Sequence, residues 1–296
     1  MMRKLAVLAC VLAYASSSMG QDVNEVISLA IANLKDTDKD TRLSAARALR
    51  QLGPKAAPAA PALAEALKDK EEEVRKAVAY AFVFIGPAGK AGVPGLVDAL
   101  QNDPSHSMRS HAVDALASIG PNAAEAVPAL MGIFKNDEDK AMRSAAAHAL
   151  AKIGPAAVMP LTDALSAQDP YTRGYAAMSL GEIDAPAKPA VKSLLKLLRD
   201  PEIKVRREAF MAISKIGPTI DEAKEALPVL IEATKSPESS VRMNAVYAIG
   251  RMGPHAKDAV PALTEALKDS DATVREFAAQ SLKKVDPQAA TNAGVK

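Results

Sequence analysis

The chain has 296 residues, of which 49% are hydrophobic and 3% aromatic, and it contains no Trp. This composition favours helices that pack closely through small side chains and argues against a strand-rich core. Lys and Arg number 37 and Asp and Glu 35, and without Arg3 and Lys4 the balance is 35 against 35. Nucleic acid is therefore not an expected partner, because proteins that bind it normally carry a net basic charge.

The first twenty residues have the composition of a secretory signal peptide. Two basic residues precede an apolar run from Leu5 to Ala13, and small and polar residues follow. This order is typical of an export signal, so we expect residues 1–20 to be removed after Gly20, with cleavage after Ala15 as the alternative. The protein is then expected to be secreted or periplasmic.

Cys10 is the only cysteine and lies inside this segment. Lipoprotein anchoring at Cys10 is the weaker interpretation, because the apolar run before it is shorter than usual for an export signal. No later apolar run approaches the roughly 20 residues that a helix needs to cross a bilayer, so no transmembrane segment is expected.

An arginine recurs at intervals of 30 to 36 residues through the rest of the chain, each time near the start of a helical pattern. A self-similar period of this length indicates stacked supersecondary units, none of which buries its apolar face alone. The eight arginines are Arg42, Arg75, Arg109, Arg143, Arg173, Arg206, Arg242 and Arg275.

Apolar residues recur at positions −1, +3, +4, +7 and +10 from each arginine, as in VRKAVAYAFVFIGP from residue 74. This spacing places them on one stripe of an α-helix. Six of the eight patterns end in Gly-Pro, where Gly takes a left-handed stop conformation and Pro cannot continue the helix. A second, Leu-rich helical pattern with Pro near its start precedes each of them, so every unit is predicted to be a helical hairpin.

An Asp stands six residues before most of these arginines, in the expected turn between the paired helices: Asp36, Asp69, Asp103, Asp137, Asp200 and Asp269. Several of these turns, such as Asp103-Pro104 and Asp200-Pro201, place a carboxylate directly before a proline. That order is favoured at the N-cap and first position of a helix, so these aspartates are expected to be N-caps.

The pattern Asp-x5-Arg-x2-Ala-Ala-x-Ala-Leu-x2-Ile-Gly-Pro resembles the HEAT repeat, in the short form called the PBS-lyase HEAT-like repeat. The resemblance implies an all-α, armadillo-type fold: a right-handed α-solenoid of about eight HEAT-like hairpins over residues 21–287. It also implies that the second helices line the concave side and that the Asp and Arg residues form a structural ladder along the stack.

Three departures from the period are expected to matter. The linker from Gly154 to Pro160 is short, and the fifth unit has Asp184-Ala185 in place of Gly-Pro, so a bend or slip is expected there. The stretch from Gly217 to Pro228 is three residues longer than usual. Residues 288–296 are polar and are expected to form a frayed C-terminal tail.

Residues that differ from unit to unit indicate a binding surface, because the repeated ones build the scaffold. Positions +2 and +5 from each arginine are neighbours on one helical face and lie off the apolar stripe. Tyr supplies a large, rigid contact area, and three of the tyrosines fall in these columns. Filling gaps between hairpins is the equal alternative for these rings. The candidate partner-binding residues are Tyr80, Asp114, His148, Tyr175, Met178, Met211 and Tyr247.

Enzyme functions find little support. His111, Asp114 and His148 could bind a metal in principle, but zinc needs ligands converging at about 2 Å, whereas packed helices lie about 8–10 Å apart. No metal site or cofactor is expected. Deoxyhypusine hydroxylase, a HEAT-like enzyme, binds iron through His-Glu dipeptides, and no His here precedes Glu. Bilin lyase activity conflicts with an export signal, and there is no Ser nucleophile elbow, phosphate-binding loop or HExxH motif.

The sequence therefore predicts an exported, non-catalytic HEAT-repeat scaffold that binds a protein or peptide on its concave second-helix face. The alternatives are a structural envelope spacer without a specific ligand and a weak metal-dependent enzyme that uses His111 and His148.

Overall fold

The computed structural model describes residues 23–217 and 220–295, without the side chains of residues 220–225. The proposed signal peptide and Cys10 lie outside the described residues. Within them every regular element is a helix, and no strand is present, as the helical periodicity predicted. The chain divides into two compact units, one ending at Ala157 and one beginning at Val158. This division falls in the shortened linker between Gly154 and Pro160.

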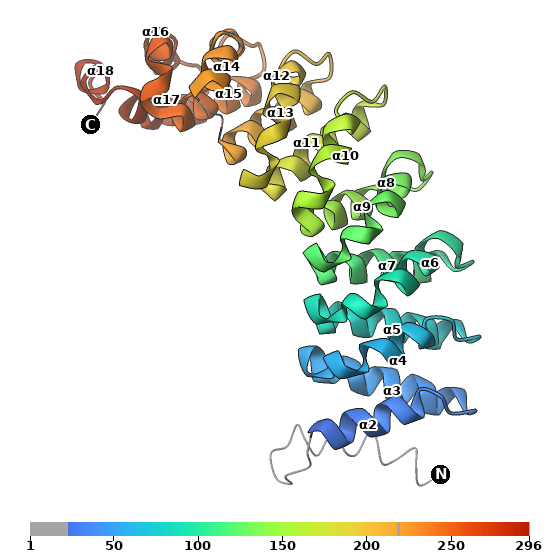
Figure 1. Cartoon of the computed structure of the whole chain (residues 1–296). Coiled ribbons are helices and arrows are strands. Elements are labelled where there is room, and N and C mark those ends of the chain that lie inside the picture. The colour runs from blue at the N-terminus through green and yellow to red at the C-terminus, as the bar shows by residue number, and fades with distance from the viewer. Residues whose placement is uncertain (1–22, 218–219, 296) are drawn as a thin grey trace. The chain divides into compact units, whose positions relative to one another are not determined.

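The first unit stacks hairpins of a first and a second helix (Figure 1). Short 3-10 helices precede three of its first helices, and a further one, η4, ends the unit. In chain order the elements are α2 (Val23–Asn33), α3 (Lys39–Leu52), η1 (Gly53–Ala59), α4 (Ala60–Ala66), α5 (Glu72–Ile85), η2 (Gly86–Gly92), α6 (Val93–Asn102), α7 (His106–Ile119), η3 (Gly120–Ala126), α8 (Val127–Asn136), α9 (Lys140–Ile153) and η4 (Gly154–Ala157).

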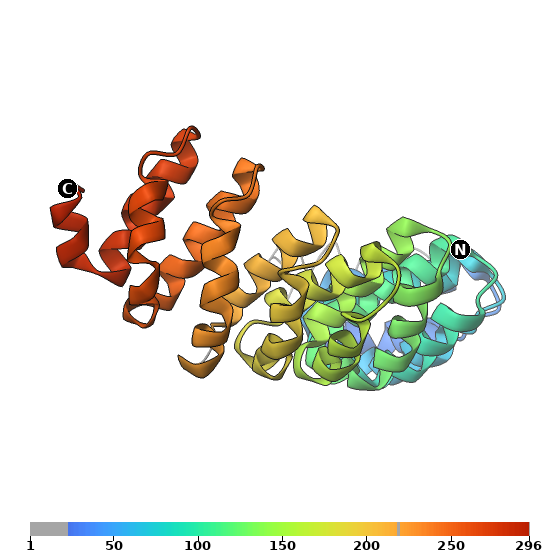
Figure 2. The same cartoon turned by 90° about the horizontal axis from the view of Figure 1, so that it is seen from above.

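The second unit continues the same alternation, seen from above in Figure 2. In the seventh hairpin the first helix, α14, is one continuous helix, and it includes most of the longer stretch between Gly217 and Pro228. The elements are α10 (Val158–Ala164), α11 (Pro170–Ile183), η5 (Ala185–Ala190), α12 (Val191–Leu197), α13 (Ile203–Ile216), α14 (Ile220–Ala233), α15 (Ser239–Met252), η6 (Gly253–Ala259), α16 (Val260–Ala266), α17 (Ala272–Val285) and α18 (Pro287–Asn292).

The core of each unit lies between the first helices and the second helices. In α5 the apolar stripe consists of five residues that are all buried: Val74, Val78, Ala79, Phe82 and Ile85. Second helices of successive hairpins also pack on one another, α3 on α5, α5 on α7 and α7 on α9 in the first unit, and α11 on α13, α13 on α15 and α15 on α17 in the second. Each hairpin therefore buries its stripe against its own partner helix and its neighbours.

The Gly-Pro stops have the expected positive φ but not the ψ of a left-handed helix. Gly86 has φ 64° and ψ −140°, and Gly120 has φ 64° and ψ −134°. This conformation turns the chain directly into the 3-10 segment that begins the next hairpin. Asp184, which replaces Gly in the fifth unit, adopts the same conformation with φ 65° and ψ −137°.

Two local expectations are wrong. Asp103 and Asp200 are not N-caps, because α7 is capped by Ser105 and the N-cap position of α13 is Glu202. Each Asp stands two residues earlier, whereas Asp169-Pro170 and Asp286-Pro287 do have the expected arrangement of N-cap and first helical position. The polar C-terminal segment is also not frayed throughout, because residues 287–292 form α18, which packs on α17 and buries Ala290.

Residues 72–102 are long and apolar enough to match a membrane span by length and composition alone. In this structure the stretch is not one continuous α-helix. Gly86, with φ 64°, ends α5, and the 3-10 helix η2 separates it from α6. The stretch thus consists of three separate elements within the stack of hairpins.

Candidate functional site: the second-helix face

The turn between the paired helices holds an arginine–aspartate ladder that orients the second helices. The guanidinium of Arg75 donates from Nε to Oδ2 of Asp103 in the next hairpin, at 2.7 Å. It also donates from Nη1 to the carbonyl oxygen of Asp69 in its own turn, at 2.8 Å. Asp103 in turn accepts from the backbone N–H of Ser105 at 2.9 Å. One arginine thus closes its own turn and joins it to the turn that follows.

The same connection between neighbouring hairpins occurs four times in the described part of the chain. Both side chains of each pair are largely buried. The pairs are Arg42–Asp69, Arg75–Asp103, Arg173–Asp200 and Arg242–Asp269.

These pairs shift the pKa of their carboxyl groups. Burial raises the pKa of Asp103, but hydrogen bonds from Arg75 and from the N–H of Ser105 outweigh it and hold that pKa below its ordinary value. The pKa values of Asp69 and Asp200 are lowered by the same balance. For Asp269 the hydrogen bond from Arg242 is the largest influence, and it lowers the pKa. All four carboxylates are therefore charged at neutral pH.

The ladder is interrupted at other junctions. Ala167 and Ser236 stand where other hairpins have the Asp, so Arg143 and Arg206 lack that carboxylate. Arg143 donates instead from Nε to the carbonyl oxygen of Phe134, at 2.9 Å. Arg109 and Asp137 are both present, yet no ion pair joins them within the described residues.

The two ends of the ladder have one neighbour each. Asp36 begins it and accepts from the N–H of Asp38, at 2.9 Å. Arg275 ends it, and its Nη1 donates only to the carbonyl oxygens of Asp269 and Ser270, at 2.7 and 3.0 Å.

We call the surface formed by positions +2, +5, +8 and +9 of the second helices, counted from each repeated arginine, the second-helix face. In the first unit it carries an aromatic and cationic cluster. The ring of Tyr80 meets Phe84 edge-on, with centroids 5.2 Å apart, and also meets His111 of α7 edge-on at 5.8 Å. The guanidinium of Arg50 in α3 lies 5.3 Å from the centroid of Tyr80 and 5.9 Å from that of Phe84.

The cluster is open to solvent. Tyr80 is 37% exposed and Phe84 47%. Beside them an open depression of about 290 Å³ is lined by residues of α3, α5 and α7, among them Arg47, Arg50, Glu73 and Tyr80. The columns at +2 and +5 predict Tyr80 as a member of this face, but not Arg50 or Phe84. Phe84 stands four residues after Tyr80, so the helical period could have found it.

Asp114 and His148 lie further along the same face, and both are exposed. Burial raises the pKa of Asp114, and the positive charges that His111 and His148 can carry oppose that rise. The three side chains are thus within electrostatic range. Nδ1 of His111 is 2.6 Å from the carbonyl oxygen of Ser107. No group of three His, Cys, Asp or Glu side chains in residues 23–217 and 220–295 could hold a metal ion.

The second unit presents two separate aromatic pairs. Tyr175 is half-buried and stacks on Tyr171, with centroids 4.4 Å apart. Tyr247 is 38% exposed and meets Phe277 edge-on at 5.6 Å. Met178 is half-buried, whereas Met211 is 44% exposed. Met211 and Tyr247 are therefore exposed members of the two columns, whereas Tyr175 and Met178 are partly covered.

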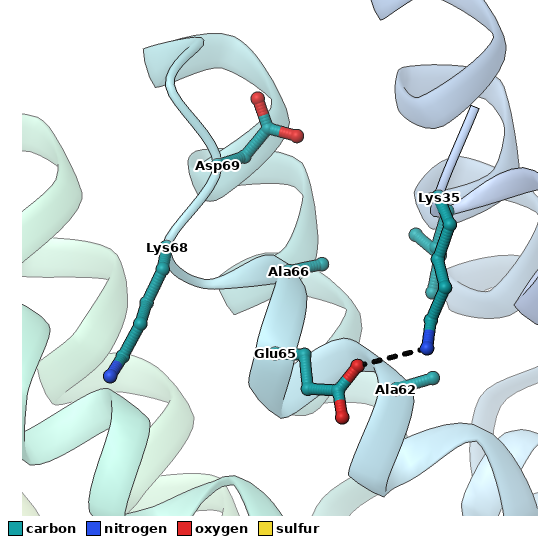
Figure 3. Close-up of a pocket in the computed structure, with 7 residues that line it drawn as sticks. Lys35, Ala62, Glu65, Ala66, Lys68 and Asp69 are labelled. Carbon is teal, nitrogen blue, oxygen red and sulfur yellow. Dashed lines mark ion pairs between the residues drawn. The ribbon is translucent and has the colours of Figure 1, made fainter. Parts of the chain in front are cut away.

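A second depression lies on the side of the first helices, between α2 and α4 (Figure 3). Lys35 and Glu65 face each other across it and form an ion pair of 3.1 Å, with side chains 66% and 70% exposed. Exposed pairs contribute about 0–1 kcal/mol. Asp69, at the edge of the depression, is held by Arg42. Lys35, Glu65 and Asp69 are therefore already engaged in pairs that the fold itself supplies.

Stacked two-helix hairpins, joined through their turns by arginine and aspartate, define an α-solenoid. The chain belongs to the HEAT-repeat family, whose sequence pattern matches residues 27–91, 93–165, 158–233 and 227–293. It matches no protein of curated function.

Solved structures share the fold at low sequence identity. A mutant of Kap121p is 16% identical with a TM-score of 0.67, and the match covers 98% of this chain and 36% of that one. Kap121p bound to Nup53p gives the same identity and coverage with a TM-score of 0.64. The Escherichia coli protein YibA is 21% identical with a TM-score of 0.51, over 91% of this chain and 98% of that one. This chain thus spans about a third of the length of Kap121p.

Proposed function

We propose that the protein is an exported, non-catalytic scaffold that binds a protein or peptide through its second-helix face. The observation that carries this proposal is the distribution of exposed large apolar side chains. Four of the six in the described residues belong to second helices: Tyr80, Phe84, Met211 and Tyr247. Aromatic residues and Met are enriched in the cores of protein interfaces, and a solenoid offers them as an extended surface.

The solved relatives support a protein as the partner. Kap121p has been solved with Nup53p, with the SUMO protease Ulp1p and with the extreme C-terminus of the phosphatase Cdc14p. The mature chain has no net charge by the count above, which disfavours nucleic acid.

Capture of partners from the exported fraction tests this function. Wild-type protein is compared with Met211→Ala/Tyr247→Ala, and Met159→Ala serves as the matched control, because Met159 is 62% exposed on the first helix α10. We expect the double variant to lose affinity for the captured partner by at least about tenfold and the control to retain it. Equal capture by all three proteins would refute binding by this face.

Export is tested on the same preparation by sequencing the N-terminus of the mature protein. The proposal expects a chain that begins at Gln21. A full-length chain that remains with the cell interior would remove the exported part of the proposal while leaving the binding surface to be judged separately.

A further inference from the structure

Two arginines on α3 have no acidic partner. Arg47 is exposed and makes no hydrogen bond or ion pair within residues 23–217 and 220–295, and Arg50 makes only its contacts with the rings of Tyr80 and Phe84. They are three residues apart, so they lie side by side on one helical face. The rings fix the position of the Arg50 guanidinium, whose fork of N–H donors matches the geometry of a carboxylate.

The face changes character from one hairpin to the next. After the arginines of α3 come the exposed rings of Tyr80 and Phe84 on α5, and then Asp114 on α7. Asp114 makes no hydrogen bond or ion pair within the part of the chain that the structure describes. The order along the first unit is therefore cationic, aromatic and anionic, and each group lies on a different second helix.

The distance between neighbouring second helices sets the spacing of the side chains with which an extended peptide would contact them. Packed helices lie about 8–10 Å apart, and an extended peptide rises about 3.3 Å per residue. About three residues of an extended chain therefore pass each hairpin. A peptide on this face would meet the arginines, the rings and the carboxylate with side chains about three positions apart.

We propose that the second-helix face of the first unit binds an extended peptide segment with an acidic, an apolar and a basic side chain spaced about three residues apart. The acidic side chain pairs with Arg47 and Arg50, the apolar one packs on Tyr80 and Phe84, and the basic one pairs with Asp114. This proposal rests on the proposed function and names the chemistry of the partner.

A continuous polyanion such as nucleic acid fits this surface less well. Glu73 lines the same depression as Arg47 and Arg50, and Lys76 is already paired with Glu72 at 3.2 Å. Asp114 follows one hairpin further on. A chain of evenly spaced negative charges would therefore meet the carboxylates of Glu73 and Asp114 as well as the two arginines.

Titration of the isotopically labelled full chain with synthetic heptapeptides, followed by NMR, tests the proposal. The parent peptide is Glu-Ser-Ser-Phe-Ser-Ser-Lys, with blocked ends so that the terminal charges are removed. Three further peptides each replace Glu, Phe or Lys by Ser, and a fourth has Lys at both ends. We expect saturable shifts of α3, α5 and α7 resonances with the parent and at least fivefold weaker binding with each Ser replacement.

Charge-exchanged protein separates binding chemistry from loss of folding. Arg47→Glu/Arg50→Glu should bind the parent at least fivefold more weakly and the peptide with two lysines more tightly than the wild type does. Lys35→Glu/Lys68→Glu, on the side of the first helices, is the matched control and should bind every peptide as the wild type does. If Arg47→Glu/Arg50→Glu binds the peptide with two lysines more tightly, its weaker binding of the parent peptide does not come from unfolding.

Three results would overturn the proposal. They are the absence of saturable binding by the parent peptide, binding of heparin or a peptide of glutamates at least as tight as the parent, and unchanged binding by the charge-exchanged variant. Self-association that the arginine variant abolishes would assign the surface to a second copy of the chain and would also overturn it. If the peptides fail while Met211→Ala/Tyr247→Ala still loses its partner, the proposed function stands without this inference.

Discussion

Asp184 takes a backbone conformation that is otherwise adopted by glycine at the ends of the second helices. Its φ of 65° is the only positive value for a non-glycine residue in the described parts of the chain. With ψ at −137° the backbone lies in a region in which a Cβ atom is strained, at a cost of about 1–3 kcal/mol. In this conformation the N–H of Asp184 donates to the carbonyl oxygen of Leu180 and closes α11, as the glycines do in other units.

Asp184→Gly is expected to stabilise the protein. Removing the strain gains about 1–3 kcal/mol, and the extra freedom of Gly in the unfolded chain returns about 0.5–1 kcal/mol. The net expectation is about 1 kcal/mol, measured as a higher midpoint of urea unfolding. A lower midpoint would show that the Asp184 side chain contributes more than the strain costs.

Gly250 of α15 lies close against Ser281 of α17. A Cβ atom built there would lie only 2.2 Å from Oγ of Ser281, and that hydroxyl donates to the carbonyl oxygen of Val246 at 2.9 Å. Gly132 on α8 has the opposite environment, because it is exposed and a Cβ atom would meet nothing within 4 Å.

Gly250→Ala is therefore expected to lower the free energy of unfolding by about 1–3 kcal/mol through overpacking. Gly132→Ala is the matched control and should raise it by up to about 1 kcal/mol through helix propensity. Thermal or urea unfolding of both variants measures the difference. If both substitutions had the same sign, the close approach of α15 and α17 would not be the cause.

The ladder acts at the scale of the element because each pair joins two hairpins. Arg242 and Arg275 make the same Nη1 hydrogen bonds to carbonyl oxygens in their own turns, but only Arg242 also has a carboxylate ahead of it. Comparing them isolates the bond between hairpins from the bonds within one turn.

Arg242→Gln should cost about 3–5 kcal/mol, because it leaves the buried Asp269 carboxylate without its cation. Arg275→Gln should cost about 1 kcal/mol, the value of its turn hydrogen bonds. Urea unfolding measures both. Equal losses would mean that the arginines act within their turns and that the bond between hairpins adds nothing.

The same bonds make stability depend on pH. The folded-state pKa values of Asp69, Asp103, Asp200 and Asp269 are lowered, so their contribution is complete above the unfolded pKa of about 3.9. It is lost as the pH falls through the lower folded values. Unfolding followed from pH 6 to pH 2 should show a steep loss below about pH 4, with a shallower slope in Asp269→Asn. An unchanged slope in that variant would exclude Asp269 as a contributor.

The helical elements follow from local rules and could be predicted, whereas their side-chain partners could not. The period of Arg75 and the stripe of Val74, Val78 and Phe82 define an amphipathic helix without knowledge of the rest. The bond from Arg75 to Asp103 depends on the register between hairpins, which the sequence alone does not show. The helical period locates Tyr80 on an exposed face, but the position of the Arg50 guanidinium over its ring again depends on the register between hairpins.

At the scale of the whole molecule, stability is a sum of hairpins and the interfaces between neighbours. The chain divides into two compact units, and within each unit the second helices of successive hairpins pack on one another. A substitution should therefore change the local stability of its own and neighbouring hairpins rather than that of the whole chain.

Hydrogen exchange measures this locality. Gly250→Ala should lower the protection of amides in α15 and α17, while α5 and α7 in the first unit retain wild-type protection. Loss of protection by a similar factor in all four helices would show that the protein unfolds as one cooperative body.

The direction of the arginine–aspartate bond bears on how long such an array can grow. The segment 69–102 begins with a carboxylate that receives the guanidinium of Arg42, and it contains Arg75, which reaches the carboxylate of Asp103 beyond its end. A tandem duplication of residues 69–102, inserted after Asn102, would carry its own Asp69 and Arg75. The first Arg75 would then pair with the second Asp69, and the second Arg75 would pair with Asp103. Chain length can thus change by whole hairpins without redesign of either neighbour.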